Sequence, residues 1–339
     1  MKNGLLNLMQ AFGAFAPFRF ANRSKALVLT YHRFGEFRDG VKTSARAFIR
    51  QLDYLASHYK IVPLSVLSDY LTSGRELPPS IAALTIDDGY LDAYEIAFPI
   101  LRRYQLPATI FLVTDFVDRK SWLWTDKLRF LTVKTRATKL EANIDGERIR
   151  FTLSGRVSRL KAATELNSRL KAIPDELKAD AIGRIASSLR ISLPLLPPHE
   201  YCSIDWDQAR KMESGGIEIG SHTLTHPILT RVSKSALQAE LRESKSRLEG
   251  ELNHTVDLFC YPNGDYDAGI KRAVEEAGYR CAVTVEPGLN DCRSDLLSLK
   301  RVHTEQDLAR FAQTTSGFEQ VKSMFRYAQA KSVAGRAQF

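Results

Sequence analysis

Short apolar runs alternate with amphipathic stretches along most of this 339-residue chain. The runs have the length and β-branched composition of buried strands. They cover residues 26–31, 81–86, 108–113, 217–219, 256–261, 280–285 and 296–302. Between them, helical spacing predicts a first helix that begins at a Thr43 or Ser44 cap. It predicts further helices over residues 64–72, 92–104, 205–213, 233–249, 267–276 and 305–311. Strands that alternate with helices favour a parallel sheet or barrel, so the pattern predicts an α/β fold.

The alternation stops between residues 121 and 200, where no strand-like run of the same kind occurs. Asp145-Gly146, between two isoleucines, is a strong β-hairpin turn sequence. Two helical stretches follow, at about residues 158–173 and 175–189. We expect an insertion or lid subdomain made of helices and a hairpin.

The sequence thus predicts one barrel domain in two parts, interrupted by an insertion. The expected segments are an amphipathic N-terminal segment (1–25), the first part of the barrel (26–120), the basic insertion (121–200), the second part of the barrel (201–311) and a helical, partly frayed tail (312–339).

The net charge is +9, and residues 127–190 carry almost all of it, with fifteen Lys and Arg against seven Asp and Glu. Such a surplus can attract nucleic acid, anionic lipid or an acidic polymer, although a solvated helical face gives the same composition. The sequence lacks aromatic interleaving and any DNA-reading motif, so we expect no nucleic-acid partner.

The N-terminal residues Leu5, Leu6, Met9, Phe12 and Phe15 form an apolar stripe at helical spacing. Polar residues interrupt this stripe, so it lacks the continuous core of a signal peptide. No apolar run approaches the roughly 18 residues of a membrane span. The four cysteines form no C-x-x-C pair and no disulfide scaffold. We expect a cytoplasmic protein that can contact a membrane surface through this amphipathic helix or the basic insertion.

Two adjacent carboxylates, Asp87 and Asp88, follow the strand predicted over residues 81–86, and Gly89 comes next. Neighbouring residues on an extended chain point to opposite sides. The two acids can therefore do different jobs at one site only if the backbone turns there, which Gly89 permits. Helix capping is the alternative interpretation, because Asp before a helix is a common N-cap.

His222 and His226 follow the strand predicted over residues 217–219. Their spacing can bring two imidazoles to one metal ion, although a capped loop would also explain it. The carboxyl ends of strands in an alternating fold form one face. Asp88 and the two histidines would then form an Asp-His-His metal site with open coordination positions.

These motifs, in this order, resemble those of the polysaccharide deacetylases of carbohydrate esterase family four. T-I-D-D-G at 85–89 is similar to the family's T-F-D-D-G, and H-T-L-T-H at 222–226 matches its H-S/T-x-x-H. The sequences at 31–33 (Y-H-R), 106–111 (L-P-A-T-I-F) and 216–222 (G-I-E-I-G-S-H) also resemble bacterial members. The resemblance covers about residues 26–120 and 200–311. It implies a distorted (β/α) barrel that removes N-acetyl groups from an amino-sugar polysaccharide, such as an exopolysaccharide or a chitin-like or peptidoglycan-like polymer.

By position, the resemblance implies that Asp87 is the general base and that Asp88, His222 and His226 hold a divalent metal, commonly zinc. Such an ion lowers the pKa of bound water and polarises the acetamide carbonyl. A nearby unligated carboxylate takes the proton as the water attacks. One acid must therefore bind the metal while the other stays free.

The remaining roles match the family's motifs less closely. The family takes its proton donor from a late strand, which indicates His303, while His32, at the end of the first strand and near the substrate, is the rival. The third motif, usually R-x-P-Y, is C-Y-P-N-G at 260–264, so the arginine that steadies the base is absent and another cation must orient Asp87, or none does. We expect Tyr261 and Asn263 at the substrate, with the Asn263 backbone N–H donating to the oxyanion. Trp206 either stacks on a sugar or is a core residue.

Three other functions use comparable residues. Asp with two His also describes non-haem iron oxygenases, but Asp87 has no required role there and their scaffold is β-rich. A hydrolase of another C–N bond, such as a cyclic amide, would use the same ligands. A non-catalytic carbohydrate-binding relative usually loses a ligand or the base, whereas all four positions are intact here. The sequence therefore predicts a metal-dependent N-deacetylase whose insertion steers or clamps its polymer.

Overall fold

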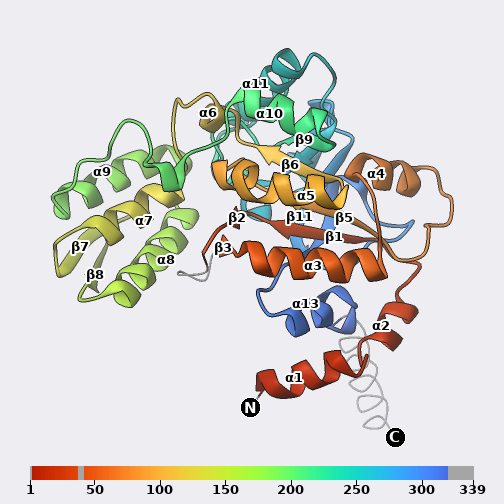
Figure 1. Ribbon diagram of the computed structural model, residues 1–339. Coiled ribbons are helices and arrows are strands. Elements are labelled where there is room, and N and C mark those ends of the chain that lie inside the picture. The colour runs from red at the N-terminus through yellow and green to blue at the C-terminus, as the bar shows by residue number, and fades with distance from the viewer. Residues whose placement is uncertain (1, 37–41, 320–339) are drawn as a thin grey trace, which may run out of the picture.

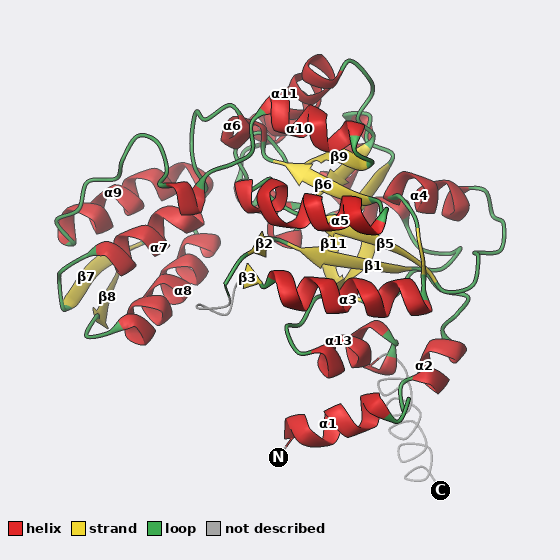
Figure 2. Ribbon diagram, in the orientation of Figure 1, coloured by secondary structure: helices red, strands yellow, loops and turns green. Residues whose placement is uncertain are grey.

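The computed structural model describes residues 2–36 and 42–319, and its centre is a closed barrel of seven parallel strands (Figures 1 and 2). Around the barrel the strands are β1 (Leu27–Tyr31), β5 (Ile81–Ile86), β6 (Ala108–Leu112), β9 (Ile217–Ser221), β10 (Leu258–Cys260), β11 (Cys281–Pro287) and β12 (Leu299–His303), which pairs again with β1. A short β4 (Lys60–Ile61) pairs with the start of β5. The expected distorted (β/α) barrel is confirmed.

Helices cover the outside of the barrel (Figure 2). They are α3 (Ala45–His58), α4 (Leu64–Thr72), α5 (Phe98–Tyr104), α10 (Trp206–Ser214), α11 (Lys234–Leu252), α12 (Ala268–Glu276) and α13 (Leu308–Thr315), with a π-helical turn at Ala93–Ala97 before α5. Ser44 caps α3 by accepting a hydrogen bond from the Ala47 backbone N–H at 3.2 Å. The helix predicted over residues 305–311 begins later because Asp307 caps α13 at the Arg310 N–H.

Successive strand residues divide between two apolar clusters, as the alternation of side chains along a strand requires. One cluster packs the strands against the helices, and the other includes Val28, Ala83 and Phe111. Gly220 leaves room for the Phe111 ring, since a Cβ there would lie 2.6 Å from it.

Residues between the two parts of the barrel build a separate lobe (Figure 1). After the short α6 (Thr114–Val117), it contains α7 (Trp124–Lys134), β7 (Lys139–Ile144), β8 (Glu147–Thr152), α8 (Arg156–Ala172) and α9 (Lys178–Ser188). These elements share their own apolar core. β7 and β8 form the expected hairpin, with positive φ at Asp145 and Gly146. The sequence did not indicate α7, whose amphipathic pattern is weak.

The N-terminal helices α1 (Lys2–Ala11) and α2 (Ala16–Ala21) lie near α13, on the flank of the barrel below α3 in the view of Figure 1. Leu6 and Met9 pack against the main core, whereas Leu8 and Phe12 are exposed. Across residues 2–36 and 42–319, no helix has both the length and the apolar character that crossing a membrane requires. The tail beyond residue 319 lies outside the described residues.

Candidate active site

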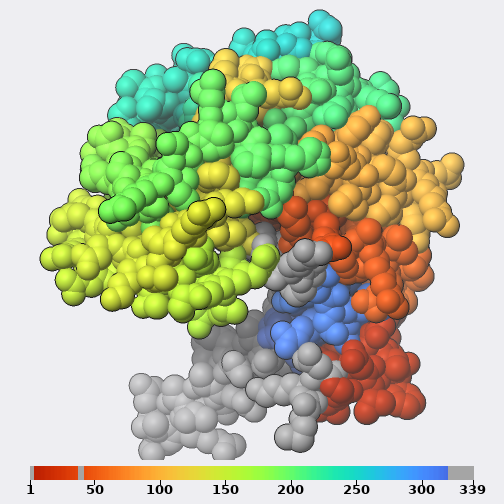
Figure 3. Space-filling model, turned by 60° about the vertical axis from the view of Figure 1, so that its left-hand side comes forward, coloured from red at the N-terminus to blue at the C-terminus, as the bar shows by residue number. Residues whose placement is uncertain are grey.

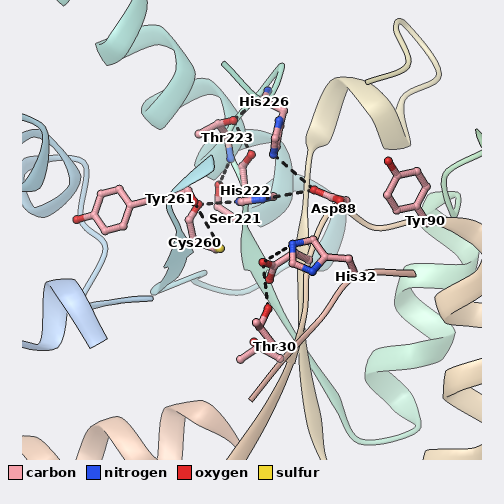
Figure 4. Close-up of polar contacts among 12 residues, drawn as sticks. Thr30, His32, Asp88, Tyr90, Ser221, His222, Thr223, His226, Cys260 and Tyr261 are labelled. Carbon is pink, nitrogen blue, oxygen red and sulfur yellow. Dashed lines mark hydrogen bonds and ion pairs between the residues drawn. The ribbon is translucent and has the colours of Figure 1, made fainter. Parts of the chain in front are cut away.

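Asp88, His222 and His226 meet at the carboxyl ends of β5 and β9 (Figure 4). The backbone turns sharply after β5, with φ of 77° at Asp88 and 84° at Gly89. A Cβ at Gly89 would lie 2.7 Å from Leu112, so the turn requires glycine. Each histidine places Nε2 3.5 Å from Asp88 Oδ1. The strand-end acids and the histidine pair therefore come together as the sequence predicts.

Hydrogen bonds within the loop and to helix α11 hold the loop that carries the two histidines. The Thr223 hydroxyl accepts a hydrogen bond from the His226 backbone N–H at 3.1 Å. Glu240 of α11 accepts from the N–H groups of Leu224 and Thr225, each at 2.9 Å. The role of Glu240 could not be predicted, because its sequence neighbours are those of an ordinary charged helix.

The chemistry of these three residues fits a metal ion of the zinc type. His222 Nδ1 lies 2.7 Å from the Cys260 carbonyl oxygen, to which it donates, so Nε2 is the ring nitrogen that faces Asp88. Burial and the neighbouring His222 lower the pKa of His226 to about 3, which keeps that imidazole neutral. Although burial opposes its ionisation, hydrogen bonding to His222 and the proximity of His226 lower the pKa of Asp88. Burial lowers the pKa of His222, but Cys260 and the hydrogen bond with Asp88 outweigh it and raise that pKa well above the ordinary value, so a bound metal ion would displace a proton from this ring. The group thus offers two imidazole nitrogens and one carboxylate oxygen, within 4.8 Å of one another.

A second set of potential ligands, Asp87, His222 and Cys260, overlaps the first. Burial raises the pKa of the Cys260 thiol, and the Arg301 guanidinium donates to its sulfur at 3.3 Å. A protonated thiol is a poor ligand, so the Asp-His-His group is the better metal site.

Arg301 of β12 clamps Asp87 from inside the barrel. Its two terminal nitrogens donate to the two carboxylate oxygens at 2.7 and 2.8 Å, and its side chain is fully buried. Burial raises the pKa of Asp87, but Arg301 and His32 outweigh it and hold that pKa well below the ordinary value. The Arg301 guanidinium thus orients Asp87 in place of the arginine that is absent from the third motif.

The two candidate proton donors lie at the carboxyl ends of adjacent strands, β1 and β12. His303 ends β12 and pairs in register with Thr30, two residues before His32. His32 Nε2 lies 3.4 Å from Asp87 Oδ2 (Figure 4). Burial is the main cause that lowers the pKa of His303, followed by the nearby His32 and Arg301. Both histidines line the same cavity.

One of the expected substrate residues lies outside the cavity, and another lines it with its ring turned away. The Tyr261 ring points away from the histidines, is fully buried and donates to the Leu297 carbonyl at 2.9 Å (Figure 4). Trp206 lies outside the cavity, where its indole N–H donates to Asp118 at 2.7 Å. Trp206 therefore does not line this cavity, whereas Tyr261 and Asn263 both do, Tyr261 with its ring turned away from the histidines.

A cavity of about 920 Å³ opens over the site, between the barrel and the insertion. Figure 3 shows the insertion, in yellow and green, beside the barrel. Trp124 lines the cavity and donates its indole N–H to the His226 carbonyl at 3.3 Å. Tyr90 donates to the buried Asp126 of α7 at 2.6 Å, and burial raises the pKa of that carboxyl to about 6. The insertion is thus tied directly to the turn that carries Asp88.

The barrel, the Asp-His-His group and the clamped Asp87 together define the site of a hydrolase. The chain belongs to the polysaccharide deacetylase family, whose model matches residues 74–282. It is therefore a hydrolase of the class that acts on the amide bond of N-acetyl groups. His32, Arg301 and His303 lie outside the matched residues.

Individual relatives are distant in sequence. YxkH of Bacillus subtilis (strain 168), a protein assigned to the polysaccharide deacetylases, is 21% identical over 287 residues, which cover 84% of this chain and 74% of YxkH. The fold resembles that of the Streptococcus pyogenes deacetylase PplD, solved in complex with acetate, with a TM-score of 0.59 and 18% identity over 86% of this chain and 98% of PplD. It also resembles IcaB from Ammonifex degensii, with a TM-score of 0.55 and 19% identity over 86% and 97% of the two chains.

Proposed function

We propose that this protein is a metal-dependent deacetylase that removes acetyl groups from N-acetylated amino sugars in a polymer. The observation that carries the proposal is the division of labour between adjacent aspartates. Asp88 Oδ1 lies 3.5 Å from Nε2 of both His222 and His226, which allows all three to bind one metal ion. Asp87 is held by Arg301 and lines the same cavity. A ligand and a free base side by side are what metal-assisted amide hydrolysis requires.

In this proposal Asp88, His222 and His226 hold the divalent ion, with zinc the best match to the donor set. A bound ion there would polarise the acetamide carbonyl and acidify water. Asp87, ionised because of Arg301, accepts the proton from the attacking water. The Asn263 backbone N–H donates to the developing oxyanion.

The leaving amine requires a proton as the C–N bond breaks. We assign this donor to His303, which lines the cavity at the end of the strand that carries Arg301. His32 is then the residue that contacts Asp87 and the substrate.

Variants of the two aspartates test the proposal directly. Asp88→Ala should lose both metal and acetate release, whereas Asp87→Asn should keep its metal and lose turnover. Asp69→Asn, an exposed carboxylate on α4, is the matched control and should change neither. Full metal occupancy in Asp88→Ala or His226→Ala would contradict the ligand set, and normal turnover in Asp87→Asn would contradict the base. Release of product from cyclic amides but not from N-acetylated sugars would indicate the alternative C–N hydrolase.

A further inference from the structure

Helix α3 carries a buried amide on a face that is otherwise mostly apolar. Gln51 is 1% exposed and shares this face with Phe48, Leu52 and Leu55, which belong to the main core. A buried amide lowers stability unless both its oxygen and its nitrogen find hydrogen-bond partners. The partners of Gln51 therefore show why an amide occupies this position.

The Gln51 amide bridges the ends of two strands. The Tyr31 hydroxyl donates to Gln51 Oε1 at 2.9 Å, and Gln51 Nε2 donates to the Glu305 backbone carbonyl at 2.7 Å. Burial raises the pKa of Tyr31, which keeps its hydroxyl protonated as the donor. The bridge thus satisfies both ends of the amide and joins β1 to the loop that follows β12.

Both ends of this bridge lie next to a histidine of the site. Tyr31 is the last residue of β1 and directly precedes His32. Glu305 comes two residues after His303, the last residue of β12. The pairing of β12 with β1 stops at His303, so side chains must hold the loop beyond it.

The His303 ring depends on its backbone for its position. The residue is exposed in the cavity, and within residues 2–36 and 42–319 the ring forms no hydrogen bond or ion pair. Two of the hydrogen bonds that hold the backbone just beyond it come from side chains. The Thr304 hydroxyl donates to the Thr30 carbonyl at 3.1 Å, and Gln51 donates to Glu305. Displacing this loop would therefore displace the imidazole.

We propose that Gln51 is a positioning residue for deacetylation and that it acts through His303. By holding the Glu305 carbonyl, its amide fixes where the His303 imidazole lies when it gives a proton to the leaving nitrogen. Gln51 itself does not line the cavity. The inference rests on the deacetylase function proposed above, with His303 as the proton donor.

The leaving group of the substrate separates a misplaced acid from a general loss of structure. An N-acetylated sugar needs a proton on nitrogen as the C–N bond breaks, whereas p-nitrophenyl acetate releases a stable anion that departs without one. Gln51→Met removes the amide and keeps a side chain of similar length. It should lower kcat on N-acetylglucosamine oligomers about ten- to a hundredfold, with KM and hydrolysis of the ester nearly unchanged. His303→Ala should show the same selectivity.

The pH profile of kcat on the oligomers gives a second reading, which does not depend on the ester. Gln51→Met should lose the alkaline limb, as His303→Ala should, because the remaining activity no longer depends on protonated His303. A general loss of structure would lower the profile without changing its shape. Tyr31→Phe removes the hydroxyl that orients the Gln51 amide and is the milder variant. It should show the same effects to a smaller degree.

Thr109→Val is the matched control. Thr109 is fully buried on β6, which β1 and β5 separate from β12, and it donates to Glu218 at 2.9 Å. Its replacement also deletes a buried hydrogen bond, so it should lower Tm without changing the selectivity or the pH profile.

Equal losses on the oligomers and the ester, or an intact alkaline limb in both Gln51→Met and Tyr31→Phe, would overturn the role of Gln51 and leave the deacetylase function standing. An intact alkaline limb in His303→Ala would overturn it as well, through the acid. A wild-type protein that releases no acetate from any N-acetylated sugar would overturn both the inference and the proposed function.

Discussion

Replacing Arg301 with methionine should leave Asp87 as a buried carboxylate without its cationic partner. The guanidinium is fully buried and donates to both oxygens of Asp87, at 2.7 and 2.8 Å. Removing one member of a buried ion pair costs about 3–5 kcal/mol, because the remaining charge is uncompensated. Burial raises the pKa of Asp87 and Arg301 opposes it, so the pKa of Asp87 should rise above its ordinary value in this variant.

The pH dependence of kcat/KM measures this change. In the wild type Asp87 stays ionised well below neutrality, whereas in Arg301→Met the acid limb should move to higher pH. Activity at a given pH should fall about tenfold for each unit by which the pKa of Asp87 exceeds that pH. Arg301→Lys keeps the charge without the two-point contact, so it should keep the acid limb and lower kcat.

The free energy of unfolding should also depend on pH through the ionisation of Asp87. The pKa of Asp87 is depressed in the folded protein, so its ionisation stabilises the fold above the ordinary pKa of about 4 and this contribution is lost as the pH falls through the folded pKa. The difference in unfolding free energy between wild type and Arg301→Met should therefore be largest near neutral pH and shrink as the pH falls through the raised pKa of Asp87 in the variant. Metal content should be unchanged. An unshifted acid limb with normal kcat in Arg301→Met would refute the assignment of Arg301 as the partner of the base.

Three further experiments test the proton donor, the tryptophan at the cavity and the N-terminal surface. His303→Ala should lose turnover, keep its metal and lose the alkaline limb of kcat, which should lie below pH 6.5 because burial, His32 and Arg301 lower the pKa of His303; the same loss in His32→Ala instead would assign the acid to β1. Trp124→Ala should raise KM for oligosaccharides, whereas Trp206→Ala should lower Tm and leave KM nearly unchanged, and the reverse pattern would restore Trp206 as the sugar-stacking residue. Phe12, 85% exposed, tests the expected membrane contact: Phe12→Asp should weaken binding to anionic vesicles, and equal binding by both proteins would exclude this surface.

The strand-end chemistry was predictable because it depends on local sequence and on one topological rule. Strands β5 and β9 are visible as apolar runs, and a parallel fold brings their carboxyl ends to one face. Asp88 and His226 could therefore be joined across more than a hundred residues. The hairpin at Asp145-Gly146 was predictable for the same reason, because its turn is specified by neighbouring residues.

Arg301 could not be assigned in advance because its role depends on barrel closure. Arginine is rarely buried without a partner, and its partner Asp87 is on a strand more than two hundred residues away. Only the return of β12 to β1, which in turn pairs with β5, places the guanidinium across from Asp87. Alternation along β12, with Arg301 buried and Lys300 exposed, was the one available signal.

The prediction for Trp206 failed because it inferred nearness in space from nearness in sequence. Its position just before the histidine loop in sequence does not bring it to the cavity, since α10 carries it to the outside of the barrel. The cavity tryptophan, Trp124, begins a helix whose amphipathic pattern is weak, and its contact with His226 arises only when the insertion packs on the barrel.

Acetate release measured by mass spectrometry before and after metal removal tests the central claim most directly. The substrates are N-acetylglucosamine oligomers, peptidoglycan fragments and cyclic amides. The account predicts acetate from at least one N-acetylated sugar polymer, loss of that activity after chelation, and its return when Zn²⁺ is added. Acetate release that persists in fully metal-free protein, or that occurs with none of the N-acetylated sugars, would contradict it.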